Sequence, residues 1–222
     1  MTSLRKSALA AGICYRVTFI SIPTLGLYAA VRTDPGYIIR AGPDTAVIIA
    51  VVLEIIVALG CIGTAVALYP VVRRRNEGVA LGFVAARTLE AATVFAGVVA
   101  LMAIVSLRQA GAGADAIITG KALLALNTWT TVLGQGFIPA LNALLLGSLM
   151  YRSRLVPRVL PVLGFIGAPI LIASVVGTLF GLWGPSSLLS GVGALLLASW
   201  EFSLGVFLVA KGFKPSPVTA GL

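Results

Sequence analysis

TAVIIAVVLEIIVALGCIGTAVALY, residues 45–69, contains a single charged side chain, that of Glu54. A helix rises about 1.5 Å per residue, and the hydrocarbon core of a bilayer is about 30 Å thick. A stretch of this length and composition is therefore long enough to cross a membrane as one helix. It predicts a transmembrane span, and it places one carboxyl group inside that span.

The whole chain has the same character. Of its 222 residues, 59% are hydrophobic and only 10% are charged, and the mean hydropathy is +1.07. A soluble domain carries roughly 25% charged residues, because its surface must face water. This chain has too few charges to cover a globule, so the composition predicts an integral membrane protein.

Apolar runs of membrane-spanning length recur along the chain and are separated by turn-forming residues such as Gly184-Pro185. We expect an all-α integral membrane protein, a single transmembrane domain over residues 1–222 with no soluble domain. The short connection at 184–187 predicts that the last two spans pack as an antiparallel hairpin. The six expected spans cover residues 7–31, 45–69, 79–107, 121–151, 159–183 and 188–210.

Basic residues in the connections are distributed unequally between the two sides of the predicted bundle. Arg32, Arg40, Arg108 and Lys121 fall on one side, and ten basic residues fall on the other. The positive-inside rule then places both termini in the cytoplasm. The side with ten contains Arg5, Lys6, Arg73, Arg74, Arg75, Arg152, Arg154, Arg158, Lys211 and Lys214.

The net charge of +9 follows from this bias. The basic residues are scattered over short loops, so they do not indicate nucleic-acid binding. The expected partner is the lipid bilayer, and the Arg73–Arg75 run can contact anionic lipid head groups, each charge contributing about 1 kcal/mol. The alternative is that this run only determines topology.

Several kinds of chemistry are excluded. The chain has no histidine, which removes histidine-ligated haem, histidine-based zinc sites and histidine-dependent hydrolysis. Cys14 and Cys61 lie inside predicted spans, and no glycine-rich phosphate loop is present. The sequence therefore indicates no cofactor and no metal site. Proton transfer by glutamate and arginine is the main catalytic chemistry left open.

Five ionisable residues lie within the predicted spans, although a charge at membrane depth costs about 2.5–3.5 kcal/mol on insertion scales. Measured along each helix from its cytoplasmic end, four of them and Asn142 lie roughly 12–16 Å deep. A common depth on four helices predicts a buried polar network, which serves either as an ion-pair clamp or as a binding site. Its expected members are Arg16, Arg87, Glu90, Glu201 and Asn142.

Glu54 is the fifth ionisable residue and does not share this depth. Two arginines face three glutamates, so complete pairing leaves one carboxylate over, and no basic residue lies at the depth of Glu54. A buried carboxylate without a partner becomes neutral by taking up a proton. Glu54 is thus the candidate proton-binding residue, or, alternatively, a protonated acid bonded to a neighbouring helix.

The fourth predicted span carries a polar stripe. Asn127, Thr131 and Gln135 are spaced four residues apart and share one helix face. Pro139 follows on the same span and removes the hydrogen bond to the carbonyl of Gln135. These four residues are candidates for lining a solvated cavity, and interhelical hydrogen bonding is the alternative.

Three segments resemble a known family: Arg5–Gly12 followed by Tyr15-Arg16, then Arg87–Glu90, then Trp200–Gly205 with Lys211-Gly212-Phe213. They are similar to the bacterial six-helix membrane family catalogued as domain of unknown function 4386. The resemblance implies a multi-pass protein of a prokaryotic inner (plasma) membrane, and it implies no activity. The matching segments contain Arg16, Arg87, Glu90 and Glu201.

Three functions remain open from the sequence. The first is a membrane scaffold or sensor in which the buried charges are structural. The second is a transporter of a small molecule, an ion or protons that uses the polar layer as its binding site. The third is an intramembrane enzyme acting on a lipid-like substrate with a glutamate acid and an arginine anchor.

Overall fold

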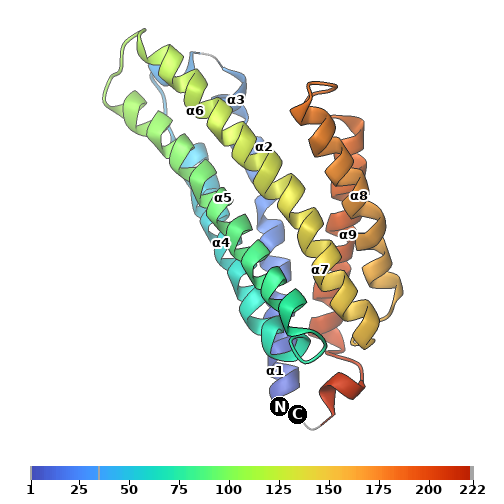
Figure 1. The fold of residues 1–222 in the computed structure, drawn as a ribbon. Coiled ribbons are helices and arrows are strands. Elements are labelled where there is room, and N and C mark those ends of the chain that lie inside the picture. The colour runs from blue at the N-terminus through green and yellow to red at the C-terminus, as the bar shows by residue number, and fades with distance from the viewer. Residues whose placement is uncertain (1, 35, 221–222) are drawn as a thin grey trace.

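The computed structural model describes residues 2–34 and 36–220 and is all-helical within them. Its membrane-length segments confirm the predicted bundle of six spans. Both ends of the chain lie at one end of the bundle (Figure 1), which we call the terminal end, and we call the other the distal end. The six segments are Ser3–Leu27, Thr45–Val72, Glu77–Gln109, Ala116–Ser153, Val159–Leu179 and Leu188–Ala210.

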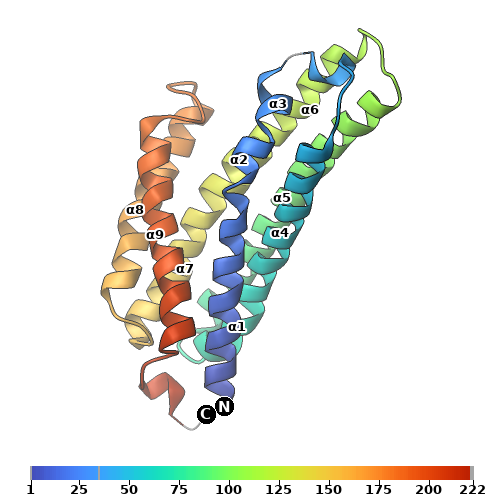
Figure 2. The same ribbon diagram turned by 180° about the vertical axis from the view of Figure 1, so that it is seen from behind.

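Neighbouring helices pack mainly in sequence order, and the first also packs against the last. This brings the two ends of the chain together and closes the terminal half of the bundle (Figure 2). The long helices are α1 (Ser3–Thr18), α4 (Thr45–Val72), α5 (Glu77–Gln109), α6 (Ala116–Thr131), α7 (Ile138–Ser153), α8 (Val159–Leu179) and α9 (Leu188–Ala210).

The first segment, for which we expected a span over residues 7–31, is broken near Pro23. Helix α1 ends at Thr18 and is followed by the 3-10 turn η1 (Phe19–Ser21), and then by α2 (Thr24–Leu27) and α3 (Ala29–Thr33). Pro23 lacks an N–H, so it cannot continue the α-helical hydrogen bonds through this region. Thr18, Phe19 and Ile22, which lie at this break, line the central cavity described below.

The fourth segment is interrupted as well, at the position where the sequence predicts a disturbance. The π-helical turn η3 (Val132–Phe137) joins α6 to α7, and Pro139 stands at the start of α7. A proline has no N–H to donate, and a π-turn absorbs the missing bond by widening the helix locally. Gln135 lies within this widened turn.

The α8–α9 hairpin forms as predicted from the 184–187 turn. It packs closely because glycines bring the two backbones together. A Cβ on Gly193 would lie 2.9 Å from Leu171 N, and one on Gly167 would lie 3.1 Å from Leu197 N. Toward the distal end the hairpin diverges from α2, α3 and α6 in both ribbon views (Figures 1 and 2). The bundle is therefore closed in its terminal half and splayed in its distal half.

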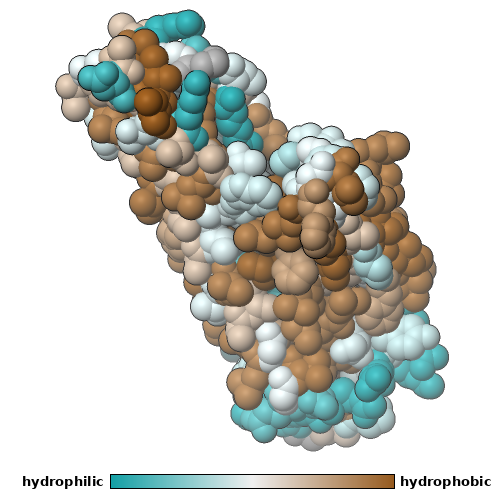
Figure 3. Space-filling model, turned by 45° about the horizontal axis from the view of Figure 1, so that its top comes forward, coloured by the Kyte–Doolittle hydropathy of each residue, from teal (hydrophilic) through white to brown (hydrophobic). Residues whose placement is uncertain are grey.

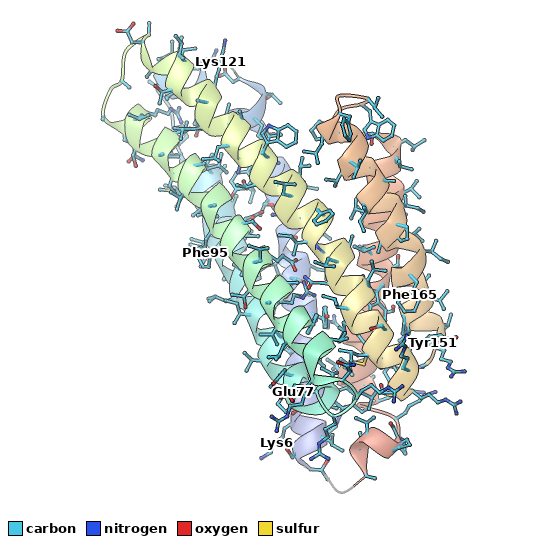
Figure 4. All side chains as sticks on the ribbon, viewed as in Figure 1. Lys6, Glu77, Phe95, Lys121, Tyr151 and Phe165 are labelled. Carbon is cyan, nitrogen blue, oxygen red and sulfur yellow. The ribbon has the colours of Figure 1, made fainter. Side chains whose placement is uncertain are left out.

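The outer surface fits a bilayer. Hydrophobic side chains cover most of the body, and hydrophilic ones gather at the terminal end and over the distal tip (Figure 3). Lys6, Glu77 and Tyr151 lie toward the terminal end, and Lys121 lies toward the distal end (Figure 4). At the terminal end, the hydroxyl of Ser216 donates to Ser153 O at 2.7 Å and holds the segment after α9 against the end of α7.

Asp44 anchors the distal loop that contains the 3-10 turn η2 (Tyr37–Ile39). Its carboxylate forms an ion pair with Arg108 and accepts hydrogen bonds from Tyr37 Oη at 2.8 Å and Gln109 Nε2 at 3.1 Å. Burial raises the pKa of Asp44, but these bonds outweigh it and hold the pKa below its ordinary value. The loop is thereby tied to the distal end of α5.

We expect Gly12→Ala to destabilise the fold, because α1 and α9 touch at this residue. A Cβ there would lie 2.8 Å from Gly205 O and 2.9 Å from Val209 N, both backbone atoms. Overpacking of this kind costs about 1–3 kcal/mol. Gly191→Ala in α9 is the control, because nothing lies within 4 Å of its Cβ position. Thermal unfolding in detergent, followed by circular dichroism, should show a lower midpoint for Gly12→Ala alone; equal midpoints would contradict the packing.

Acid should weaken the Asp44 anchor. A folded-state pKa below the unfolded value, which is about 3.9 for aspartate, means that the stabilisation is complete above that value and is lost as the pH falls through the folded pKa. Wild type should therefore exceed Asp44→Asn in unfolding free energy by a constant amount from about pH 7 to pH 5, and by less below about pH 4. Asp115→Asn is the control. A difference that persists unchanged to about pH 3 would refute this.

Candidate functional site

Arg87 of α5 is the centre of a cluster of polar side chains inside the bundle. The residue is 1% exposed. Its Nη1 donates to Glu90 Oε2 at 2.8 Å, and its Nη2 donates to Glu201 Oε1 at 2.6 Å. Glu90 lies one helical turn further along α5, where i and i+3 side chains share a face. The guanidinium also lies over the ring of Tyr15, 5.0 Å from its centroid.

Two further helices contribute to the same cluster. Asn142 of α7 donates from Nδ2 to Glu90 Oε2 at 2.6 Å, and the thiol of Cys61 on α4 donates to Glu90 Oε1 at 3.6 Å. Together with Glu201 on α9, these bonds connect four helices through Arg87 and Glu90. We call Arg87, Glu90, Glu201, Asn142 and Cys61 the polar cluster. The structure thus brings four of the five predicted network residues into contact.

Arg16 is a correction, because the structure leaves it outside the polar cluster. Its side chain is exposed, and its guanidinium lies 5.8 Å from the centroid of the Phe202 ring. Successive helix residues point about 100° apart, and Tyr15 takes the inward direction on α1. The depth of Arg16 was a guide to its height in the membrane but carried no information about its direction around the helix.

A central cavity of about 220 Å³ lies beside the polar cluster, between the first segment and α9. The glutamates at positions 90 and 201 are both on its wall, whereas Arg87 is not. Most of the remaining wall is apolar, and small residues on α9 leave the space open. The other wall residues include Thr18, Phe19, Ile22, Val57, Cys61, Val94, Gln135, Pro139, Leu171, Ala194, Leu197 and Ala198.

The charges of the cluster are therefore layered. Arg87 is packed behind the two glutamates, and both glutamates line the central cavity. With all three groups ionised the cluster has one negative charge in excess. Among the described residues no side chain donates to Glu201 Oε2, and the side chain of Glu201 is 18% exposed. This oxygen is free to accept a hydrogen bond or a positive charge from an occupant.

Glu54 stands apart from the cluster, as its depth predicted, and lines a second, small cavity of about 10 Å³. Glu54 is 7% exposed. Its Oε1 lies 3.1 Å from Thr24 Oγ1, and its Oε2 accepts from Gln135 Nε2 at 3.1 Å. Arg32 is on the wall of the same cavity. The prediction that no basic residue lies at the depth of Glu54 is therefore wrong. Arg32, which follows the break at Pro23, lines the same cavity and donates from Nη2 to Asn127 Oδ1 at 3.2 Å.

The polar stripe of the fourth segment divides between the two cavities. Asn127 and Thr131 line the small cavity, Pro139 lines the central cavity, and Gln135 lines both. Asn127 also donates to Gly97 O at 3.1 Å, which fixes it against α5. The π-turn explains the division, since its extra width turns the helix face between residues 131 and 139.

Sequence reasoning missed three contributors. They are Cys61, Tyr15 and Thr24. A single thiol, tyrosine or threonine within a hydrophobic span gives no signal that separates it from a packing residue. Only their contacts with Arg87, Glu90 and Glu54 distinguish them.

The family model described as "Domain of unknown function (DUF4386)" matches residues 10–212. The chain belongs to this family, as the resemblance of its terminal and Arg87–Glu90 segments suggested. Searches of curated proteins and of solved structures gave no match. The matched range includes both cavities and every member of the polar cluster.

We expect Arg87→Met to lower the free energy of unfolding by about 3–5 kcal/mol, because it leaves two buried carboxylates without their cation. Combining it with Glu201→Gln should cost less than the sum of the two single changes, since they remove one interaction. Arg16→Met is the control and should change stability little. Unfolding of the four variants and wild type in detergent completes the cycle; additive losses would show that the ion pairs do not support the fold.

Proposed function

We propose that this DUF4386 protein is a transporter that binds a small amphiphilic cation in the central cavity. The observation that supports this most strongly is the position of Glu90 and Glu201, which lie between a buried arginine and an open cavity. An occupant with one positive charge would neutralise the excess negative charge of the cluster.

The shape of the cavity favours a small ligand. Its volume of about 220 Å³ lies below the range of roughly 300–1,000 Å³ that is usual for drug-sized ligands. Val57, Val94, Leu171 and Leu197 present hydrocarbon to the interior. A compact organic ammonium, with an apolar body against these side chains and its charge toward Glu201, would satisfy both parts of the wall.

The same observation favours binding over a purely structural clamp. A carboxylate that only supports the fold gains most when it is covered, because solvent screens exposed ion pairs. Here Arg87 is covered and Glu201 remains partly open. An intramembrane enzyme is supported less well. The thiol of Cys61 on the described wall donates to Glu90, but this carboxylate already accepts from Arg87 and Asn142 and is therefore a weak base.

We also propose that the terminal end faces the cytoplasm of a prokaryotic cell and that the protein resides in the inner membrane. The excess of basic residues at that end supports this by the positive-inside rule. Arg73, Arg74 and Arg75 are exposed there and are suited to anionic lipid head groups.

The binding step can be tested with benzyltrimethylammonium as the probe, by titration calorimetry on the protein in lipid nanodiscs. Wild type should bind it, and Glu201→Gln should bind it about tenfold more weakly. Losing a charge-assisted contact costs about 1.5–3 kcal/mol, and about 1.4 kcal/mol corresponds to a factor of ten. Uptake of the same cation into proteoliposomes then tests transport.

Two controls make this result specific. Glu77→Gln removes an exposed carboxylate remote from the cavity and should leave affinity unchanged. Neopentylbenzene, the neutral carbon isostere of the probe, should bind wild type and Glu201→Gln equally. The proposal fails if wild type does not bind the cation, or if the cation binds both proteins equally.

A further inference from the structure

The small cavity around Glu54 is built to hold a polar occupant. Its volume of about 10 Å³ is close to the minimum for one water molecule, about 10–15 Å³. Tyr28 is 2% exposed and its hydroxyl, on this cavity, has no hydrogen-bond partner among the described residues. A buried hydroxyl without a partner is costly, so this position calls for a small hydrogen-bonding species.

The surroundings of Glu54 favour its protonated form. The residue is 7% exposed, and its two carboxyl oxygens meet the neutral side chains of Thr24 and Gln135, each at 3.1 Å. Among the described residues no cation lies within ion-pair distance of Glu54, and Arg32 Nη2 donates instead to Asn127 Oδ1 at 3.2 Å. A buried carboxyl group with only neutral partners is more stable when it holds a proton.

The groups that face Glu54 allow that proton to leave. Arg32 on α3 is the one cation on the described wall of the small cavity, and Tyr28 is the other titratable group. Gln135 and the α5 and α6 residues on this wall are uncharged. The carboxyl group on α5 that is nearest in sequence is Glu90, which lies one helical turn before Val94 and lines the central cavity. On α4 the titratable residue that follows Glu54 is Cys61, which also lines the central cavity. Arg32 can therefore compensate an ionised Glu54.

Gln135 connects the two cavities. It lines both, and its Nε2 donates to Glu54 Oε2 at 3.1 Å. Its amide group thus binds Glu54 directly, and the same residue lines the central cavity in which the cation is proposed to bind. Positive charge entering the central cavity would favour negative charge at Glu54 through this short, poorly solvated path.

Charge balance gives the stoichiometry. With Glu54 protonated, the charges of Arg32, Arg87, Glu90 and Glu201 sum to zero. If one monovalent cation enters the central cavity and one proton leaves Glu54, the sum is again zero. Net charge at membrane depth is costly, so the paired exchange is favoured over either step alone.

We propose that Glu54 is a proton-binding site linked to the central cavity, so that binding of one organic cation releases one proton from Glu54. This inference rests on the proposed function, because it names the counter-ion of the same ligand. The step is a simple exchange: the carboxyl O–H bond of Glu54 breaks, the proton passes to solvent, and the carboxylate is paired by Arg32.

The test is titration of the protein with benzyltrimethylammonium in nanodiscs, at one pH, in buffers that differ in ionisation enthalpy. The dependence of the observed heat on buffer gives the number of protons released. Wild type and the control Glu77→Gln should release about one proton for each cation bound, and Glu54→Gln should bind the cation and release none. Cation binding by wild type without proton release would overturn the linkage. Proton release that persists in Glu54→Gln would also overturn the linkage, because the proton would then come from Glu90 or Glu201.

Infrared spectroscopy separates the proton site from the proposed function. At neutral pH wild type should show the C=O stretching band of a protonated carboxyl, and Glu54→Gln should lack it. Absence of this band from wild type overturns the assignment of the proton whatever the cation does. If the band is present but no cation binds, the transport proposal and the linkage fall together, and the proton site stands.

Discussion

The buried guanidinium of Arg87 is the constraint on which the bundle depends. A permanent positive charge at this depth must be compensated, and the fold does so with Glu90 from the same helix and Glu201 from the last helix. The second ion pair brings α9 to α5 across the bundle, and packing of α1 against α9 then closes the terminal half. The two glutamates carry one more negative charge than is needed to compensate Arg87, and both of them line the central cavity.

The fold could be predicted from the sequence because lipid imposes simple rules. Apolar length set the number of spans, and the turn at 184–187 set the antiparallel hairpin of α8 and α9. The interruptions were harder. The disturbance at Pro139 was predicted from the sequence. The break at Pro23 has an additional cause in three hydroxyl groups, each of which donates to the carbonyl three residues earlier: those of Thr18, Ser21 and Thr24. Such local competition is not visible in hydropathy.

The site could be predicted in part. Depth along each helix correctly grouped Arg87, Glu90, Glu201 and Asn142, because residues at the same depth on helices of similar tilt lie at the same level of the bundle. It failed for Arg16, since depth contains no direction around the helix axis. It also failed for Arg32, which lines the cavity of Glu54 from beyond the break in the first segment. The two cavities lie on either side of Gln135, within the π-turn that precedes Pro139. No pattern of residue types predicts such a space.

The proposed function requires a cation to bind in the central cavity beside the glutamates of the polar cluster. A crystal structure with 4-bromobenzyltrimethylammonium would locate this cation, because bromine is identified by its anomalous scattering. We expect a bromine peak against the apolar wall formed by Leu171 and Leu197, with the ammonium group beside Glu201 Oε2. A bromine peak elsewhere, or a collapsed cavity with Glu90 and Glu201 covered by protein, would rule out this binding site.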